Sequence, residues 1–256
     1  MEIIIFIAAF LGALLTFFSG FGLGTVLLPV MIIFLPPGTA ILSTAIIHFI
    51  NNGLKFGLIY KNVNIKVAVH FGVVAILGAF LGAYCISYFQ SLGHAYQVSW
   101  LANPVSVSYP NAIIGALLIV FAFMEKAKSS KVHTNINVGQ YLGGALSGFF
   151  GGLSGHQGAL RSLFLSPIIK EKNAFVATGA AIALVVDIMR ISVYFYKGDF
   201  WTMSYNHLIL LGIAGALIGT ILSKKLLTKI TYKHLNTTVM VSLICLGIAM
   251  LLGYIH

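Results

Sequence analysis

Four charged side chains lie inside stretches apolar enough to be embedded in a membrane: Lys55, Arg161, Asp187 and Arg190. A charge at the centre of a bilayer costs on the order of 2.5–3.5 kcal/mol on insertion scales, so such residues usually have a function. Three of the four are basic and one is acidic, which gives the embedded segments a net charge of +2. This excess of positive charge favours an anionic ligand.

Arg161 is the strongest candidate for contact with that ligand. Asp187 and Arg190 are three residues apart on one expected helix and can pair with each other as structural residues. Lys55 lies near the end of its expected span, where a long side chain can extend to the membrane surface. Arg161 has no acidic neighbour in the sequence. It follows a glycine-rich stretch where open N–H groups and the positive end of a helix dipole are expected.

That glycine-rich stretch, Ser147–Gly158, holds five glycines in twelve residues. Each glycine gives up about 1 kcal/mol of helix stability relative to alanine, so we expect an unwound break between two short helical arms. Inside a bilayer, unwound backbone persists only where protein or a water-filled cavity satisfies its polar groups. A second glycine-rich stretch, Ser19–Gly24, predicts a similar break. Each break is therefore a candidate binding site.

Uncharged polar side chains near these breaks can donate hydrogen bonds to an oxyanion. His48 and Asn52 lie near the middle of the third apolar segment, and His156 and Gln157 lie at the second break. Hydrogen bonding between helices is the alternative role for such residues, and we favour it for Asn51.

The composition is that of a polytopic membrane protein, because 59% of the 256 residues are hydrophobic and only 8% are charged. We expect an all-α fold in a single transmembrane domain over residues 1–256, in contact with the lipid bilayer. The net charge of +10 reflects loop residues that orient the chain in the membrane, not binding to nucleic acid. Cys85 and Cys245 fall inside apolar runs and predict buried small side chains, so we expect no metal site and no cofactor.

The apolar segments follow the same plan twice. Each half begins with two short arms joined at a glycine break, which predicts a hairpin, and continues with about three full spans. We place the first repeat at residues 1–125, a polar linker at 126–137 and the second repeat at 138–256. The expected arms and spans are residues 3–18, 25–35, 39–60, 67–89, a span ending near 124, 138–150, 159–169, 174–196, 205–223 and 237–254, with a polar loop reaching to about 108.

Matching residues support a duplication of the two halves. Gly24 and Thr44 correspond to Gly158 and Thr178 at an offset of 134; Asn52 and Lys55 correspond to Asp187 and Arg190 at 135; His70, Gly78, Ala79 and Gly82 correspond to His207, Gly215, Ala216 and Gly219 at 137. Each half crosses the membrane an odd number of times, so the halves should have inverted topology. Alternating access around a central site is the mechanism that such repeats predict.

The distribution of lysines predicts the orientation. Eleven loop lysines fall on one side of the expected membrane and one, Lys197, falls on the other. The lysine-rich side is therefore cytoplasmic and both termini lie outside. The first break then enters from outside and the second from the cytoplasm, so that the two tips can meet near the middle of the membrane.

Two motifs resemble a known family. The segment Ser-Gly-Phe-Gly-Leu-Gly-Thr-Val-Leu-Leu-Pro at 19–29 is similar to the first glycine-rich motif of the TauE/SafE sulfite exporter family. Gly-Gly-Leu-Ser-Gly-His-Gln-Gly-Ala-Leu-Arg-Ser at 151–162 resembles a variant of the second motif. The resemblance implies a bacterial inner-membrane permease for sulfite, organosulfonates or related sulfur-containing anions. A coupling ion, either a proton or sodium, is a further expected partner.

We expect the substrate to contact residues of both motifs and of the spans beside them. The expected substrate-binding set is Gly22, Gly24, Thr25, His48, Asn52, Lys55, Ser154, Gly155, His156, Gln157, Arg161, Asp187 and Arg190.

Two other classes of protein remain as alternatives. Gly152-Leu153-Ser154-Gly155 has the form found around the nucleophile of rhomboid intramembrane proteases, with His48 or His156 as a base. A duplicated architecture argues against a protease, because catalysis needs only one site. A cation carrier would use Asp187, and the positive interior argues against that reading.

Overall fold

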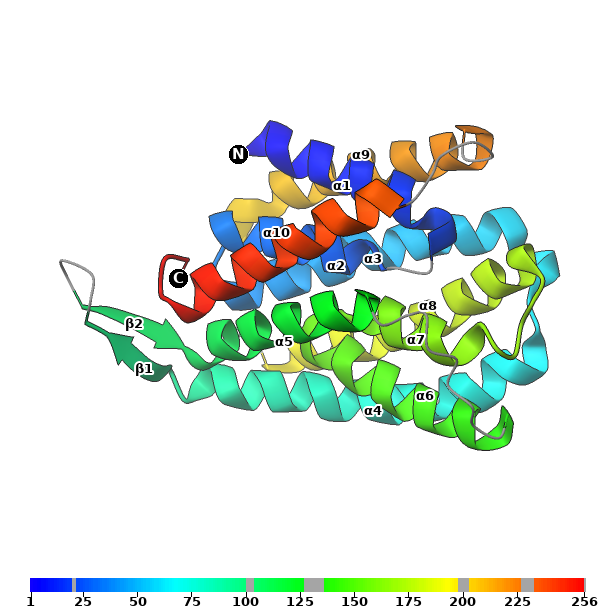
Figure 1. Ribbon diagram of the computed structural model, residues 1–256, viewed down its shortest axis with the longest axis horizontal. Helices are drawn as coiled ribbons and strands as arrows, with labels where there is room; N and C mark the ends of the chain where they lie inside the picture. Colours follow the sequence, from blue (N-terminus) through cyan, green and yellow to red (C-terminus); the bar gives the residue numbers. More distant parts are fainter. Residues whose placement is uncertain (20–21, 100–103, 127–135, 198–202, 227–232, 256) are drawn as a thin grey trace.

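The computed structural model describes residues 1–19, 22–99, 104–126, 136–197, 203–226 and 233–255. Ten α-helices and one β-hairpin account for most of these residues (Figure 1). In chain order the elements are α1 (Glu2–Ser19), α2 (Leu23–Phe34), α3 (Pro37–Ile59), the 3-10 turn η1 (Tyr60–Asn62), α4 (Ile65–Ser91), β1 (His94–Val98), β2 (Val105–Ser108), α5 (Tyr109–Lys126), α6 (Ile136–Ser154), α7 (Gln157–Leu165), α8 (Lys172–Lys197), η3 (Met203–Tyr205), α9 (Asn206–Leu226) and α10 (Lys233–Leu251).

The second glycine break is much shorter than the sequence predicts. Helix α6 continues through Gly148, Gly151 and Gly152, and only Gly155 and His156 separate it from α7. The prediction that residues 147–158 are unwound is therefore wrong. These glycines were expected to weaken the helix, but the close packing of a second helix offsets that cost.

That second helix is α4, which packs along α6. A Cβ atom at Gly152 would overlap the backbone of Ala79, and one at Gly148 would overlap the backbone of Ala75. In return, a Cβ at Gly82 of α4 would overlap the carbonyl oxygen of Phe149. Small residues on both helices therefore bring the two backbones into contact.

Helices α1 and α9 form a matching pair. Gly215 and Gly219 of α9 lie against the carbonyl oxygens of Phe6 and Phe10 of α1, where a Cβ atom would leave no room. In Figure 1 the α1–α9 pair lies at the top of the molecule and the α4–α6 pair at the bottom. Each pair thus joins a helix from the first half of the chain to one from the second half.

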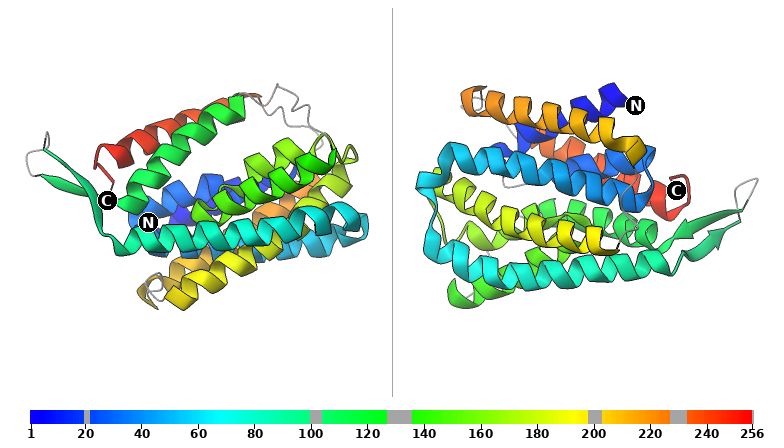
Figure 2. Two further views of the ribbon diagram at one scale, coloured as in Figure 1. Left: turned by 90° about the horizontal axis from the view of Figure 1, so that it is seen from below. Right: turned by 180° about the vertical axis from the view of Figure 1, so that it is seen from behind.

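Two further pairs complete the helical bundle. Helix α3 packs against α8 between the outer pairs, and α5 packs along α10, where Gly115 and Gly247 approach each other closely (Figure 2). The main apolar core lies between α1, α2, α3 and the helices around them, and a second cluster lies between α4, α7 and α8.

The outward faces of the helices are strongly apolar. On α4 alone, eight large hydrophobic side chains point out of the bundle: Ile65, Val69, Val73, Leu77, Phe80, Leu81, Tyr84 and Tyr88. Within the described residues, α4, α8 and the segment Asn206–Ser223 of α9 are long and apolar enough to cross a membrane. An outer surface of this kind needs lipid around it, so the chain is an integral membrane protein.

The segment between α4 and α5 adds one short β-hairpin to the all-α architecture that the sequence predicts. The polar loop expected there contains β1 and β2, which pair antiparallel and project from one end of the bundle (Figures 1 and 2). The Tyr96 hydroxyl donates a hydrogen bond of 2.5 Å to the Leu251 carbonyl, which ties the hairpin to the end of α10. The alternating Val-Ser-Val-Ser of β2 is a strand pattern that favours this structure.

Candidate functional site

The two helix breaks lie against each other inside the bundle. A Cβ atom at Gly22, before α2, would lie 3.6 Å from the backbone nitrogen of Gly158 in α7. One at Gly24 would lie 3.1 Å from the carbonyl oxygen of Gly155. Gly155 has φ = +81°, a left-handed backbone conformation that favours glycine and turns the chain from α6 into α7. The absence of side chains at these positions allows the two breaks to touch.

A cavity of about 30 Å³ lies beside this contact. It is lined by polar and apolar residues from both halves of the chain: Thr16, Gly22, Leu23, His48, Asn52, Lys55, Arg161, Ser162, Phe175, Val176, Gly179 and Ala180. In this conformation the volume suits roughly one or two water molecules. Five members of the expected substrate-binding set line it: Gly22, His48, Asn52, Lys55 and Arg161.

Arg161 reaches the cavity from the second turn of α7. The side chain is buried, with 8% of its surface exposed, and Nη1 donates a hydrogen bond of 3.0 Å to Oε1 of Gln157 one turn earlier. Gly179 of α8 makes room for the guanidinium, because a Cβ atom there would lie only 3.4 Å from Nε. Among the described residues, no acidic side chain forms an ion pair with Arg161.

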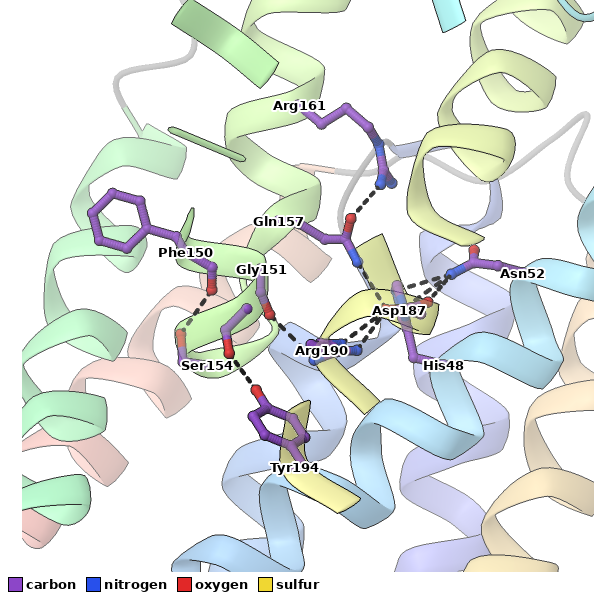
Figure 3. A network of polar contacts seen from close by, with 11 residues as sticks. His48, Asn52, Phe150, Gly151, Ser154, Gln157, Arg161, Asp187, Arg190 and Tyr194 are labelled. Carbon is purple, nitrogen blue, oxygen red and sulfur yellow. Dashed lines mark hydrogen bonds and ion pairs between the residues drawn. The ribbon is translucent and has the colours of Figure 1, made fainter. Parts of the chain in front are cut away.

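Asp187 of α8 holds the buried polar side chains together (Figure 3). Its Oδ2 accepts hydrogen bonds from Nδ1 of His48 at 2.7 Å and from Nδ2 of Asn52 at 3.3 Å. Its Oδ1 accepts from Nε2 of Gln157 at 3.0 Å and from Nε of Arg190 at 3.0 Å. The carboxylate is completely buried, and these donors replace the water that it loses.

Arg190 is paired with Asp187 and lies behind the cavity. Nη2 is 2.8 Å from Oδ1 of Asp187, and Nη1 donates to the Gly151 carbonyl at 3.4 Å. The guanidinium also fills the space beside Gly155, where a Cβ atom would lie 2.7 Å from Nη1. Arg190 therefore contacts both Asp187 and the second break.

Lys55 does not extend to the membrane surface. The residue is 6% exposed and lines the cavity together with Arg161. The snorkelling role that the sequence favours for Lys55 is therefore wrong. Its position on α3 faces the centre of the bundle, so the same face that carries His48 and Asn52 also carries the lysine.

Several expected residues lie outside the cavity lining. Gln157, Asp187 and Arg190 lie one layer behind it, connected to Arg161 and His48 by hydrogen bonds. Gly24, Thr25 and Gly155 are buried at the contact between the breaks. Ser154 and His156 point elsewhere: the Ser154 hydroxyl is 2.9 Å from Nδ1 of His156, whose ring stacks on Phe121 of α5.

The cavity also includes residues that sequence reasoning missed. Ser162, one residue after Arg161, and Phe175, Gly179 and Ala180 of α8 are such residues. Tyr194 supports the site from behind, because its hydroxyl donates to the Gly152 carbonyl (Figure 3). Small residues near the start of α8 give no chemical signal in the sequence, and only their packing against Arg161 identifies them.

Helices with a lipid-facing surface, two breaks in contact and buried cations beside them define a membrane transporter. The chain belongs to the sulfite exporter TauE/SafE family, whose family model matches residues 5–250. Members of this family are permeases, not enzymes, so the contact between Ser154 and His156 is not a protease site. An anionic substrate and a lipid bilayer are the partners that this family implies. No curated protein and no solved structure matches the chain.

Proposed function

We propose that the protein exports small sulfur-containing anions, such as sulfite or an organosulfonate, through the site between its two helix breaks. The observation that carries this proposal is the pair of buried cations, Lys55 and Arg161, on one cavity. Among the described buried residues the one acidic side chain, Asp187, is already engaged by Arg190 and His48. Two cationic side chains on one cavity favour an anion there over a cation.

The chemistry of the lining residues suits an oxyanion. A guanidinium can donate two parallel hydrogen bonds to two oxygens of one sulfite or sulfonate group, and an ammonium adds a point charge. Asn52 and Ser162 add neutral polar groups. Leu23, Phe175 and Val176 add apolar surface to the lining, and interactions between charges are stronger in apolar surroundings than in water.

The packing of helices from one half of the chain against helices from the other half supports transport by alternating access. Helix α4 packs on α6 and α9 packs on α1, and the glycines at those contacts are the matched pairs Gly78–Gly215 and Gly82–Gly219. Such an arrangement suits inverted repeats that rock around a central site. In such a mechanism the two breaks move relative to each other when the substrate enters and leaves.

Membership of the family supports placement in the inner membrane, and the lysine distribution supports an orientation with both termini outside. In this orientation the β-hairpin lies outside, and the turns that hold Lys61, Lys66 and Lys170 lie in the cytoplasm. Export then proceeds from the lysine-rich side to the side of the hairpin.

Flux measurements in proteoliposomes test this function. Vesicles containing the purified protein are loaded with sulfite, ethanesulfonate, sulfate or chloride, and the release of each anion is followed. We expect a sulfur oxyanion to leave faster than from protein-free vesicles and Arg161→Ala to abolish the difference. Gly53→Ala is the matched control, because the space beside that glycine is open. Equal release of all four anions with and without protein would contradict the proposal.

A further inference from the structure

The ring of His48 connects the cavity to the buried carboxylate of Asp187. His48 is 1% exposed and lines the cavity, and its Nδ1 is 2.7 Å from Oδ2 of Asp187. An ionised carboxylate only accepts hydrogen bonds, so it holds the ring proton on Nδ1. The second ring nitrogen, Nε2, faces the first break, where a Cβ atom at Gly22 would lie 3.6 Å away. The side chain of Asn52 lies beside the ring, with Nδ2 2.9 Å from Nδ1 and 3.3 Å from Nε2.

The protonation state of Nε2 determines whether His48 attracts or repels an anion in the cavity. A neutral ring protonated on Nδ1 presents at Nε2 only a lone pair, which can accept a hydrogen bond from Nδ2 of Asn52 at 3.3 Å and repels the lone pairs of an oxyanion. A ring that is also protonated on Nε2 presents a charged N–H donor, and charge-assisted hydrogen bonds of this kind are the stronger ones. Binding of a proton to Nε2 therefore favours binding of the anion, and the reverse holds by reciprocity.

The charges around His48 make this coupling strong. Asp187 and Arg190 face it from α8, Arg161 from α7, and Lys55 lies two turns further along α3. Helix α2 has no titratable side chain, and the described side chains of α5 and α9 add only Tyr109 and His207 at the ends of those helices. Three cations and one carboxylate oppose a further positive charge while the cavity holds no anion. A bound anion offsets that repulsion.

Asp187 is a poor alternative as the group that binds the proton. Its two oxygens already accept hydrogen bonds from His48, Asn52, Gln157 and Arg190. Protonation of the carboxylate would weaken these bonds and leave the Arg190 guanidinium buried without its counter-charge. Protonation of Nε2 of His48 keeps all four of these hydrogen bonds and gives up only the contact between Nε2 and Nδ2 of Asn52.

We propose that His48 binds a proton together with each anion, so that the protein co-transports the two; this inference rests on the function proposed above. The net charge carried per cycle is then one less negative than that of the anion alone. The proton motive force can drive or oppose transport through this one residue.

Calorimetric titration of the full chain in detergent tests the proposal. The probes are sodium sulfite and sodium ethanesulfonate; a sulfonate stays ionised around neutral pH, so any proton taken up with it must bind the protein. Titrations in two buffers of different ionisation enthalpy give the number of protons bound per anion. For the parent we expect about one proton per anion near neutral pH, and an affinity that falls by up to about tenfold per pH unit as the pH rises.

The variant His48→Gln keeps a hydrogen-bond donor but cannot take up a proton. We expect its proton uptake to disappear and its affinity to become independent of pH with ethanesulfonate, whereas sulfite retains only the contribution of its own ionisation. His207→Gln, which removes a half-exposed histidine beside Glu2, is the control and should behave as the parent does.

Two results would overturn the proposal: binding of ethanesulfonate to the parent without proton uptake, or the same uptake in His48→Gln as in the parent. If His48→Gln does not fold, His48→Asn takes its place, and the proton count of the parent already decides the first result. Failure of both probes to bind the parent contradicts the proposed function itself and removes this inference with it.

Discussion

Asn52 and Asp187 lie 135 residues apart in the chain, and their side chains meet inside the helical bundle. Nδ2 of Asn52 lies 3.3 Å from Oδ2 of Asp187. Each is followed three residues later by a cation, Lys55 in the first half and Arg190 in the second. Asp187 is a carboxylate and pairs with Arg190, whereas position 52 holds a neutral amide and Lys55 lines the cavity.

This difference predicts that Asn52→Asp weakens anion binding. A carboxylate at position 52 would pair with Lys55 at i, i+3 and add a negative charge beside the cavity. The loss of one charge-assisted hydrogen bond, about 1.5–3 kcal/mol, corresponds to roughly ten- to hundred-fold in affinity. The measurement is anion-dependent thermal stabilisation of the purified protein. Asn52→Ser, which changes no charge, should lose less; equal losses in both variants would contradict the charge argument.

The sequence predicts the helical architecture well because apolar runs and lysine-rich turns mark the spans directly. The expected spans at 67–89 and 174–196 agree with α4 and α8 to within about two residues at most ends. The sequence does not predict that the glycines of the second motif lie within the continuous helix α6. Composition gives the cost of Gly148 and Gly152 in a helix but not the backbone of α4 that offsets it.

The candidate site also differs from the sequence prediction because the sequence does not give the directions of the side chains. Ser154, His156 and Gln157 are consecutive or nearly so at the break, yet only Gln157 connects to Arg161 and Asp187. The His156 ring stacks on Phe121, and its Nδ1 lies 2.9 Å from the Ser154 hydroxyl. The order of these residues in the sequence suggests that all three belong to one site. In the structure, Gln157 belongs to the polar network around Asp187, and Ser154 and His156 do not.

Close packing of α4 on α6 predicts a strong effect of alanine at Gly152. The added methyl group would overlap the backbone of Ala79, and backbone cannot move as a flexible side chain does. Overpacking of this kind costs about 1–3 kcal/mol or more, so the melting temperature should fall. Gly53→Ala on the exposed side of α3, where no atom lies within 4 Å, is expected to be neutral or stabilising. A Gly152→Ala protein as stable as Gly53→Ala would show that the two helices are not in contact.

The ion pair between Asp187 and Arg190 predicts non-additive substitutions. Asp187→Asn leaves a buried guanidinium without its counter-charge, and Arg190→Gln leaves a buried carboxylate with one partner fewer. Each single variant should be destabilised by about 3–5 kcal/mol, and the double variant should recover much of that loss. Thermal or denaturant unfolding of all four proteins measures the coupling. Simple addition of the two losses would mean that the pair does not act as a unit.

The proposed orientation predicts which positions an impermeant thiol reagent can reach in intact cells. In a background without Cys85 and Cys245, a cysteine at His94 in the β-hairpin should be labelled. Cysteines at Lys66 or Lys170, in the turns assigned to the cytoplasm, should be protected until the cells are opened. All three positions are on described, exposed parts of the chain. Labelling of Lys66→Cys and His94→Cys from the same side would contradict the topology.

Arg161 is expected to contact the transported anion and to select for its charge. Its guanidinium is buried, lines the cavity and donates a hydrogen bond to the neutral amide of Gln157. Among the described residues it forms no ion pair with an acidic side chain. Arg161→Lys should keep the charge but lose the two-pronged hydrogen bonding, and Arg161→Ala should lose both. We expect affinity to fall by roughly ten- to hundred-fold for alanine, from about 1.5–3 kcal/mol, and by less for lysine.

Anion-dependent thermal stabilisation separates this role from a structural one. A ligand raises the melting temperature only when it binds the folded state. If Arg161 contacts the ligand, a variant without it should melt normally in the absence of anion, and added anion should no longer raise its melting temperature. An arginine that only braces α7 against Gly179 and Gln157 would instead lower the melting temperature without anion and leave the shift intact. Arg161→Ala should show the first pattern, and Gln157→Ala should show a mixture, because that amide both positions Arg161 and donates to Asp187. The assignment fails if Arg161→Ala folds normally and is stabilised by sulfite as strongly as the parent is.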